Sequence, residues 1–270
     1  MARFFDILQT FLFVVCLLVL FSPLGHTQDE SESIKTLRVV SLQYPPFQYE
    51  VDGKPYGITV DIVQEAFMRL NIPISIYFHP FPRAIHKIKN GNADIIFTLY
   101  YKKSREEFVH YSRLILIEQT MSLFAKKDRK IKYEGLLNKL SPYSFGMVRY
   151  SYGKVLDTAV QEQKITKVEY ISDTELNFKK FLGGRFDILP SDKMVAYYYL
   201  HQLNPHWHLE IQEFSPAIET FPAYVGFAKT PKMEQLRDKF DQAIQSMKYD
   251  GTYQKIITKH LDTLKPATQR

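Results

Sequence analysis

The feature that most constrains the fold of this sequence is an alternation between short apolar runs and amphipathic segments, which occurs twice along the chain. In the first round, apolar runs at residues 37–42, 74–78 and 93–99 have the length of strands. Apolar residues at helical spacing lie between these runs, at residues 61–70 and 84–88. Strands that alternate with helices form a parallel sheet covered by those helices. The first round therefore predicts a βαβαβ unit.

The alternation restarts at residue 121. Further strands are predicted at residues 121–125, 144–148, 168–171 and 186–189. A helix is predicted at residues 193–203, and two apolar stripes near the C-terminus predict further helices. The charged segment at residues 126–130 is interpreted as a crossing between domains. We therefore expect two α/β lobes, the second inserted in the first. The first lobe is predicted at residues 37–125 and 225–265, and the second at 126–224.

An apolar run at residues 11–21 follows Arg3 near the N-terminus. It is shorter than the roughly 20 residues of a membrane-spanning helix. Small residues and a proline follow it, as in a secretory signal peptide. We predict a signal peptide at residues 1–27 and a periplasmic protein; an uncleaved anchor is the alternative. Cys16, the only cysteine, lies inside this run, so the mature chain would form no disulfide.

Composition excludes several classes of protein. The 270 residues are 45% hydrophobic and 24% charged, which is typical of a globular chain and not of a disordered or polytopic membrane protein. The net charge of +6 is spread along the sequence, so we expect no nucleic-acid partner. Hydrolase motifs and phosphate-binding glycine loops are absent from the sequence, and we expect no cofactor. His201, His206 and His208 are interpreted as a surface loop, with a metal site as the alternative.

Five short motifs occur in a fixed order along the chain. They are Tyr44-Pro45-Pro46-Phe47, Gly57-Ile58-Thr59-Val60-Asp61, Gly91-Asn92-Ala93-Asp94, Ser104-Arg105 followed by Tyr111-Ser112, and Gly184-Arg185-Phe186-Asp187 leading to Asp192. In this order they resemble the periplasmic solute-binding proteins of polar amino-acid ABC transporters, of the smaller two-lobed type. The resemblance covers residues 37–261. It implies the type II periplasmic-binding-protein fold, with a mainly parallel sheet flanked by helices in each lobe and a hinge that closes over the ligand.

The resemblance also implies a set of ligand-binding residues. An aromatic wall, a strand end and an arginine for the ligand carboxylate come from the first lobe. A loop of backbone donors and an acidic residue for the ligand ammonium come from the second. The predicted ligand-binding residues are Tyr44, Phe81, Arg83, Thr98, Tyr100, Arg105, Arg149, Tyr152, Gly153 and Asp192.

The chemistry of two of these residues agrees with their implied roles. The Arg105 guanidinium can grip a carboxylate with two parallel hydrogen bonds. An ionised Asp192 carboxylate accepts hydrogen bonds and suits an ammonium group. Each also has a structural alternative, because Arg105 lies within a capping box formed by Ser104 and Glu107, and Asp192 lies between a predicted strand and a predicted helix. We expect Asp61 to act only as a helix cap. We also expect Ser172 and Glu175 to form a second capping box.

The loop at residues 149–153 departs from the family pattern, because tyrosine stands where a Gly-Thr pair is usual. This departure favours an unusual amino acid or a related small polar metabolite as the ligand. Together with the resemblance, we expect an amino acid or a related zwitterion, delivered to an ABC permease by a monomeric binding protein. One alternative is a ligand-sensing partner of a membrane receptor. The other is a dehydratase of cyclic carboxylic acids, for which Glu118, Glu219 and His110 are candidate general acids or bases.

Overall fold

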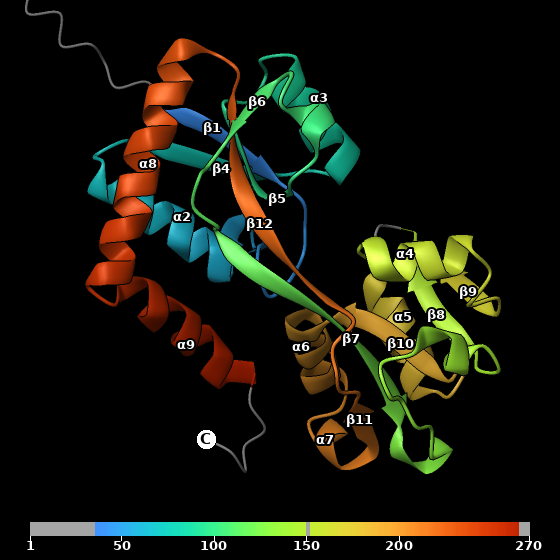
Figure 1. Ribbon diagram of the computed structural model, residues 1–270. Helices are drawn as coiled ribbons and strands as arrows, with labels where there is room; N and C mark the ends of the chain where they lie inside the picture. Colours follow the sequence, from blue (N-terminus) through green and yellow to red (C-terminus); the bar gives the residue numbers. More distant parts are fainter. Residues whose placement is uncertain (1–35, 150–151, 265–270) are drawn as a thin grey trace, which may run out of the picture. The chain divides into compact units, whose positions relative to one another are not determined.

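The computed structural model describes residues 36–149 and 152–264 (Figure 1). The predicted signal peptide at residues 1–27 lies outside the described residues. Within them, ten strands form one mixed sheet in the order β4-β1-β5-β12-β7-β10-β8-β9, with β6 paired to β12 and β11 paired to β7. A separate hairpin is formed by β2 (Tyr49–Val51) and β3 (Lys54–Tyr56). The predicted α/β class is confirmed.

The first lobe is built on three parallel strands. They are β1 (Leu37–Ser41), β4 (Ile74–Phe78) and β5 (Ile95–Tyr100), and β1 lies between the other two. Helices α2 (Ile58–Arg69) and α3 (Phe81–Lys89) connect them, as the βαβαβ prediction requires. The C-terminal helices α8 (Pro231–Tyr249) and α9 (Thr252–Leu264) belong to the same lobe, and α8 packs against α2 through Phe240 and Phe67, whose ring centroids are 5.5 Å apart.

The second lobe repeats the parallel arrangement. Its strands are β8 (Phe145–Val148), β9 (Val168–Ile171) and β10 (Ile188–Asp192), with β8 in the middle. Its helices are α4 (Lys154–Gln161), α5 (Thr174–Leu182), α6 (Lys193–Leu203) and the short α7 (Trp207–Glu210). The predicted bounds of β9 and α6 are confirmed.

Two ten-residue strands connect the parallel groups. They are β7 (Ile117–Lys126) and β12 (Glu219–Ala228), here called the connecting strands, and they pair antiparallel with each other. Strand β12 also pairs with β5 of the first lobe, and β7 with β10 of the second. Figure 1 shows the two strands running side by side. The exact residues at which the lobes meet stay a prediction.

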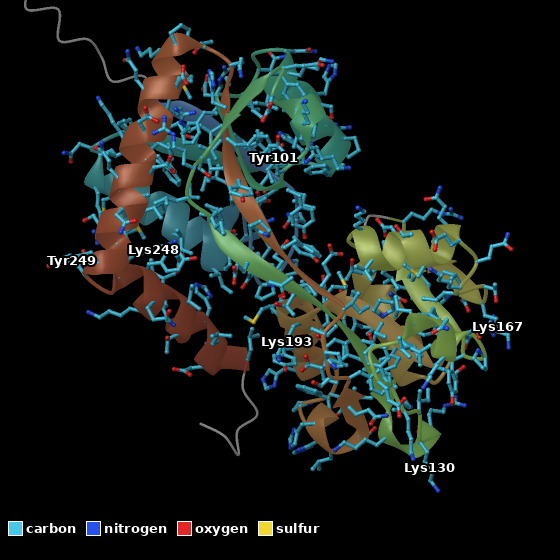
Figure 2. The ribbon with its side chains drawn as sticks, in the orientation of Figure 1. Tyr101, Lys130, Lys167, Lys193, Lys248 and Tyr249 are labelled. Carbon is cyan, nitrogen blue, oxygen red and sulfur yellow. The ribbon has the colours of Figure 1, made fainter. Side chains whose placement is uncertain are left out.

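Several short elements complete the fold. They are β6 (Val109–Tyr111), β11 (Ile211–Glu213) and the 3₁₀ turns η1 (Lys103–Arg105), η2 (Lys127–Arg129) and η3 (Leu137–Leu140). In the described part of the chain, no helix has both the length and the apolar character needed to cross a bilayer. The labelled lysines Lys130, Lys167, Lys193 and Lys248 project from different elements (Figure 2), so these charges are not gathered on one element.

The helix caps predicted for α2 and α5 are wrong. Helix α2 begins at Ile58, so Asp61 lies inside its first turn and does not cap it. The chain can turn into α2 there because Gly57 has a φ of +123°, and a Cβ at this position would overlap the Phe47 carbonyl oxygen. Helix α5 is capped by Asp173, which accepts from the Leu176 N–H, and not by Ser172.

The histidine segment, which was interpreted as a loop, is a loop only at residues 204–206, around Asn204 and Pro205. His201 lies in α6 and His208 lies in α7, and the buried Trp207 anchors α7 by stacking on Tyr197 at 5.3 Å. Among residues 36–149 and 152–264, no three His, Cys, Asp or Glu side chains are grouped as a metal site requires.

Candidate functional site

Arg105 is held at the end of β5 by two contacts. The 3₁₀ turn η1 folds the chain back after β5, so that the Arg105 Nη1 donates to the Tyr100 carbonyl oxygen at 2.6 Å. The guanidinium also lies over the Phe81 ring, 5.2 Å from its centroid. No helix starts here, so the predicted capping box of Ser104 and Glu107 is not formed. A guanidinium has five N–H groups, and the other four of Arg105 have no acceptor among the described residues.

Tyr100 links Arg105 to both connecting strands. Its hydroxyl donates to the Gln119 Oε1 on β7, and its ring contacts Phe221 of β12 edge-on at 4.7 Å. Gln119 and Phe221 are directly paired across these strands. The Gln119 side chain is 1% exposed, and its Nε2 has no acceptor among the described residues.

Gly153 of the second lobe lies next to Glu219 and Phe221 of β12. It precedes α4 with a φ of +95°, and a Cβ at this position would lie 2.6 Å from the Glu219 Oε2 and 2.9 Å from the Phe221 Cε1. Glu219 is half-buried, and its Oε2 accepts from the Val155 N–H in the first turn of α4 at 3.1 Å. A carboxylate is stabilised at this end of a helix. Gly153 is therefore required by the close approach of Glu219 and Phe221.

These contacts define one continuous group, which we call the connecting-strand cluster. Its members are Tyr100, Gln119, Gly153, Glu219 and Phe221, with Arg105 and Phe81 next to it. Of the predicted site residues, the structure thus brings Phe81, Tyr100, Arg105 and Gly153 together. Gln119 and Phe221 were not predicted, and Glu219 was noted only as a possible acid or base. The sequence carries no clear signal for them, because Gln119 lies in a polar run before the predicted strand at residues 121–125, and Phe221 is an apolar residue in a strand that was not predicted.

Thr98 and Tyr44 lie in a neighbouring polar network. The Thr98 Oγ1 donates to the Gln48 Oε1 at 2.9 Å, and the Thr59 hydroxyl donates to the same oxygen at 2.8 Å. Thr98 is 7% exposed and has a φ of +58°, opposite the irregularity in β12 after Tyr224. A β-branched residue rarely adopts this conformation. Tyr44 is half-buried and stacks on Phe47 at 5.8 Å.

The remaining predicted residues point elsewhere. Arg83 is exposed on α3. Arg149 is also exposed, and its guanidinium lies 4.6 Å from the centroid of the Tyr170 ring on β9. Tyr152 is fully buried in the core of the second lobe, where its hydroxyl accepts from the Val148 N–H at 2.6 Å. Its predicted place in the loop of backbone donors stays a prediction. Residues 150–151 lie outside the described chain.

Asp192 is the N-cap of α6, as its structural alternative predicted. Its Oδ1 accepts from the Met194 N–H at 2.8 Å and the Val195 N–H at 3.2 Å, and its Oδ2 accepts from the Thr120 N–H at 3.0 Å. The side chain is 1% exposed. Burial raises the pKa of this carboxyl to about 7, although the three backbone hydrogen bonds oppose the shift. Its predicted contact with the ligand stays a prediction.

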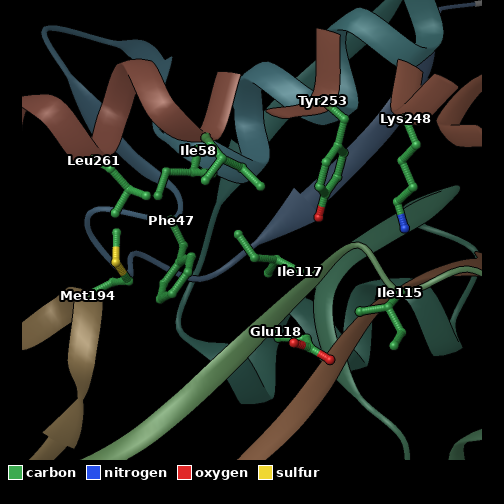
Figure 3. A pocket seen from close by; sticks show the side chains of 10 residues that line it. Phe47, Ile58, Ile115, Ile117, Glu118, Met194, Lys248, Tyr253 and Leu261 are labelled. Carbon is green, nitrogen blue, oxygen red and sulfur yellow. The ribbon is translucent and has the colours of Figure 1, made fainter. Parts of the chain in front are cut away.

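A separate cavity of about 380 Å³ lies between β7, α8, α9 and the start of α6 (Figure 3). Its lining is mostly apolar and includes Phe47, Ile117 and Met194, with Glu118 and Lys248 as its charged groups. None of the predicted site residues lines it.

Solved structures share this fold. An ancestral arginine-binding protein bound to arginine superposes with a TM-score of 0.68 at 22% identity, over 84% of this chain and 98% of that chain. A histidine kinase sensor domain with similarity to periplasmic binding proteins gives a TM-score of 0.69 at 14% identity, over 85% and 97% of the two chains. The two-lobed periplasmic-binding-protein fold is therefore confirmed.

The sequence defines the family within this fold. The profile of the bacterial extracellular solute-binding proteins, family 3, matches residues 37–263, and the chain belongs to that family. The ABC transporter arginine-binding protein 1 of Escherichia coli (strain K12) is 24% identical over 221 residues, which cover 80% of this chain and 86% of that protein.

Proposed function

We propose that the protein binds an amino acid or a related zwitterion between its lobes, outside the cytoplasm, and delivers it to an ABC transporter. The observation that carries this proposal is the arrangement of Arg105. Its guanidinium is fixed by Phe81 and by the Tyr100 carbonyl oxygen, while most of its donors remain without an acceptor in the described chain. The family supports the proposal, as does the arginine-binding relative.

In this proposal, each group of the site has a role in binding the ligand. The Arg105 donors bind the ligand carboxylate, because a guanidinium fork matches a carboxylate in shape and charge. The rings of Phe81, Tyr100 and Phe221 pack against the apolar part of the ligand. Gly153 and the start of α4 bring the second lobe to the same group of residues. We expect closure of the lobes to remove the ligand from water.

A thermal-shift screen of the mature chain against the twenty L-amino acids, followed by titration calorimetry, tests the proposal. Arg105→Ala should weaken binding of the amino acid found by about 30-fold or more, because its carboxylate would be desolvated without a partner. Arg113→Ala is the matched control, since this arginine is 68% exposed and pairs with Asp238 at 3.3 Å, away from the cluster. Equal affinity of Arg105→Ala and wild type would contradict the role of Arg105.

Ligand sensing is the second candidate function, and the fold shared with a histidine kinase sensor domain favours it. Binding would be the same, but the docking partner would be a membrane receptor and not a permease. Measurement of permease ATPase activity with the liganded protein separates the two. Stimulation supports transport, and stimulation of a receptor kinase instead supports sensing.

We propose binding and not turnover. Of the three acid–base candidates, Glu219 alone belongs to the connecting-strand cluster. His110 lies 4.0 Å from Glu234 of α8, and Glu118 lines the separate cavity. Incubation with cyclic hydroxy acids, followed by ultraviolet absorbance of any aromatic product, checks this directly. Turnover would favour the dehydratase.

A further inference from the structure

We propose that Glu219 accepts the ammonium group of the ligand, and that Gln119 on the neighbouring strand donates to the ligand carboxylate. The inference rests on the proposed function, because it takes the ligand to be an amino acid or a related zwitterion. It gives Glu219 the role that the family resemblance implied for Asp192.

Asp192 has little capacity left for a ligand. Its two oxygens already accept three backbone N–H groups, from Thr120, Met194 and Val195. The side chain is also 1% exposed, so an ammonium group has almost no access to it in this arrangement of the chain. The carboxylate that binds the ligand should instead have an open oxygen.

Glu219 meets this requirement. Its Oε2 accepts one hydrogen bond, from the Val155 N–H, and no described residue donates to its Oε1. Among the described residues, no lysine, arginine or histidine forms an ion pair with Glu219. Phe221 lies beside its Oε2 at Gly153, and Tyr100 contacts Phe221. An aromatic ring next to a carboxylate can offer its face to a cationic ligand group.

Gln119 provides an independent observation. Its side chain is 1% exposed, and the Nε2 is a buried donor with no acceptor in the described chain. Buried donors nearly always have a partner in native proteins. The Oε1 of the same amide accepts from the Tyr100 hydroxyl, which places this donor in the connecting-strand cluster. A ligand carboxylate would supply the missing acceptor.

Strand register places the two groups within reach of one zwitterion. Glu219 is paired with Met121 and Phe221 with Gln119, so the side chains of Glu219 and Gln119 lie on the same face of the sheet. They are diagonal neighbours, with backbones about 7–8 Å apart. The Glu219 carboxylate also occupies the start of α4 and repels a ligand carboxylate from there. The ligand is therefore oriented with its ammonium toward Glu219 and its carboxylate toward Gln119 and Arg105.

The test uses the mature chain and matched probes. The twenty L-amino acids are first screened by thermal shift on the wild type. For the amino acid that binds, its deaminated acid and its decarboxylated amine are then titrated by calorimetry; for L-arginine these are 5-guanidinopentanoate and agmatine. Wild type, Glu219→Gln, Gln119→Met and Asp192→Asn are compared. Glu219→Gln keeps an oxygen that can accept from the Val155 N–H, and unliganded melting curves verify folding.

We expect Glu219→Gln to weaken binding of the amino acid by about 30-fold or more and to leave binding of the deaminated acid unchanged. Gln119→Met should weaken binding of the amino acid by about 10-fold and leave binding of the amine unchanged. Asp192→Asn should have a much smaller effect than Glu219→Gln. A residue with a purely structural role would affect both probes equally.

Three results would each overturn this inference but leave the proposed function standing. They are wild-type affinity of Glu219→Gln for the amino acid, an equal loss of affinity of Glu219→Gln for the amino acid and the deaminated acid, and a larger loss of affinity in Asp192→Asn than in Glu219→Gln. If Glu219→Gln does not fold, wild-type affinity in Gln119→Met overturns it. If no amino acid binds the wild type, the proposed function fails first and the inference falls with it.

Discussion

Burial separates the roles of residues that look alike in the sequence. Tyr100 and Tyr152 are both tyrosines for which the family resemblance implies ligand contact, yet Tyr100 is half-buried in the connecting-strand cluster and Tyr152 is fully buried in a core. Spacing within a motif does not reveal which side of a loop faces the core. For the same reason, Asp192 could be predicted as a cap and as a ligand contact, and only the structure shows that its oxygens accept two N–H groups of α6 and one of β7.

Tyr152→Phe should destabilise the protein without changing ligand affinity. The substitution removes the acceptor of the partly buried Val148 N–H, and a buried donor without a partner costs about 1–3 kcal/mol, so we expect a loss toward the lower end of that range. Urea unfolding measures the free energy of unfolding, and calorimetry measures the affinity. A loss of affinity at unchanged stability would restore Tyr152 as a ligand contact.

Asp192 should make stability depend on pH. Its ordinary pKa of 3.8 applies to the unfolded chain, whereas burial raises the pKa in the folded protein to about 7. Between these values the folded state holds a proton that the unfolded state has lost, so the contribution to stability is present at low pH and is lost as the pH rises toward 7. The slope from this one group is at most about 1.4 kcal/mol per pH unit.

Unfolding of wild type and Asp192→Asn by urea from pH 4.5 to pH 8 checks this. The difference in free energy of unfolding between the two should shift in favour of the variant as the pH rises. Asp173→Asn, at the exposed cap of α5, is the control. Parallel curves for wild type and Asp192→Asn would contradict the prediction.

At the scale of elements, regular apolar spacing in the sequence was sufficient to predict the bounds of a helix or strand where one face of the segment is buried. Strands β4 and β9 and helix α6 have the bounds that were predicted from apolar spacing. Strand β12 was not predicted, because Glu219, Pro222 and Gly226 interrupt its apolar run and each disfavours a strand by itself. Pairing with β5 and β7 overrides those local preferences. Most of the unpredicted site residues lie in this strand and its partner β7.

Asp61 joins two elements instead of capping one. Its Oδ2 lies 2.9 Å from the His260 Nε2, so it ties α2 to α9. Burial alone would raise the pKa of Asp61, but the His260 hydrogen bond and the charges of His260 and Lys259 lower it below 3.8. This contribution to stability is present above pH 3.8 and is lost as the pH falls through the lowered value.

Asp61→Ala should lower the free energy of unfolding by about 1 kcal/mol at pH 7, as expected for a partly exposed pair. Affinity for the ligand should stay at the wild-type level, because Asp61 is not part of the cluster. Chemical unfolding and calorimetry on the same sample test both statements. A variant of full stability but weakened binding would contradict them.

For the whole molecule, the family and the two-lobed fold predict closure around the ligand. The predicted site residues come from both lobes, and the connecting strands carry Gln119, Glu219 and Phe221 between them. Small-angle scattering of the mature protein should show compaction when a saturating amino acid is added. Arg105→Ala at the same ligand concentration is the control and should remain less compact. An unchanged profile for a wild-type sample that calorimetry shows to be saturated would contradict closure.

The pairing of β7 with β12 also determines what kind of motion this closure is. Residues 117–121 and 219–223 form an antiparallel ladder of two strands. Such a ribbon twists readily, but it cannot lengthen without breaking its rungs. The lobes should therefore rotate about the ribbon and not slide along it. A ligand that binds both Gln119 and Glu219 would hold the ribbon at one twist angle. The contacts that determine ligand specificity would then also fix the angle between the two lobes that a membrane partner meets.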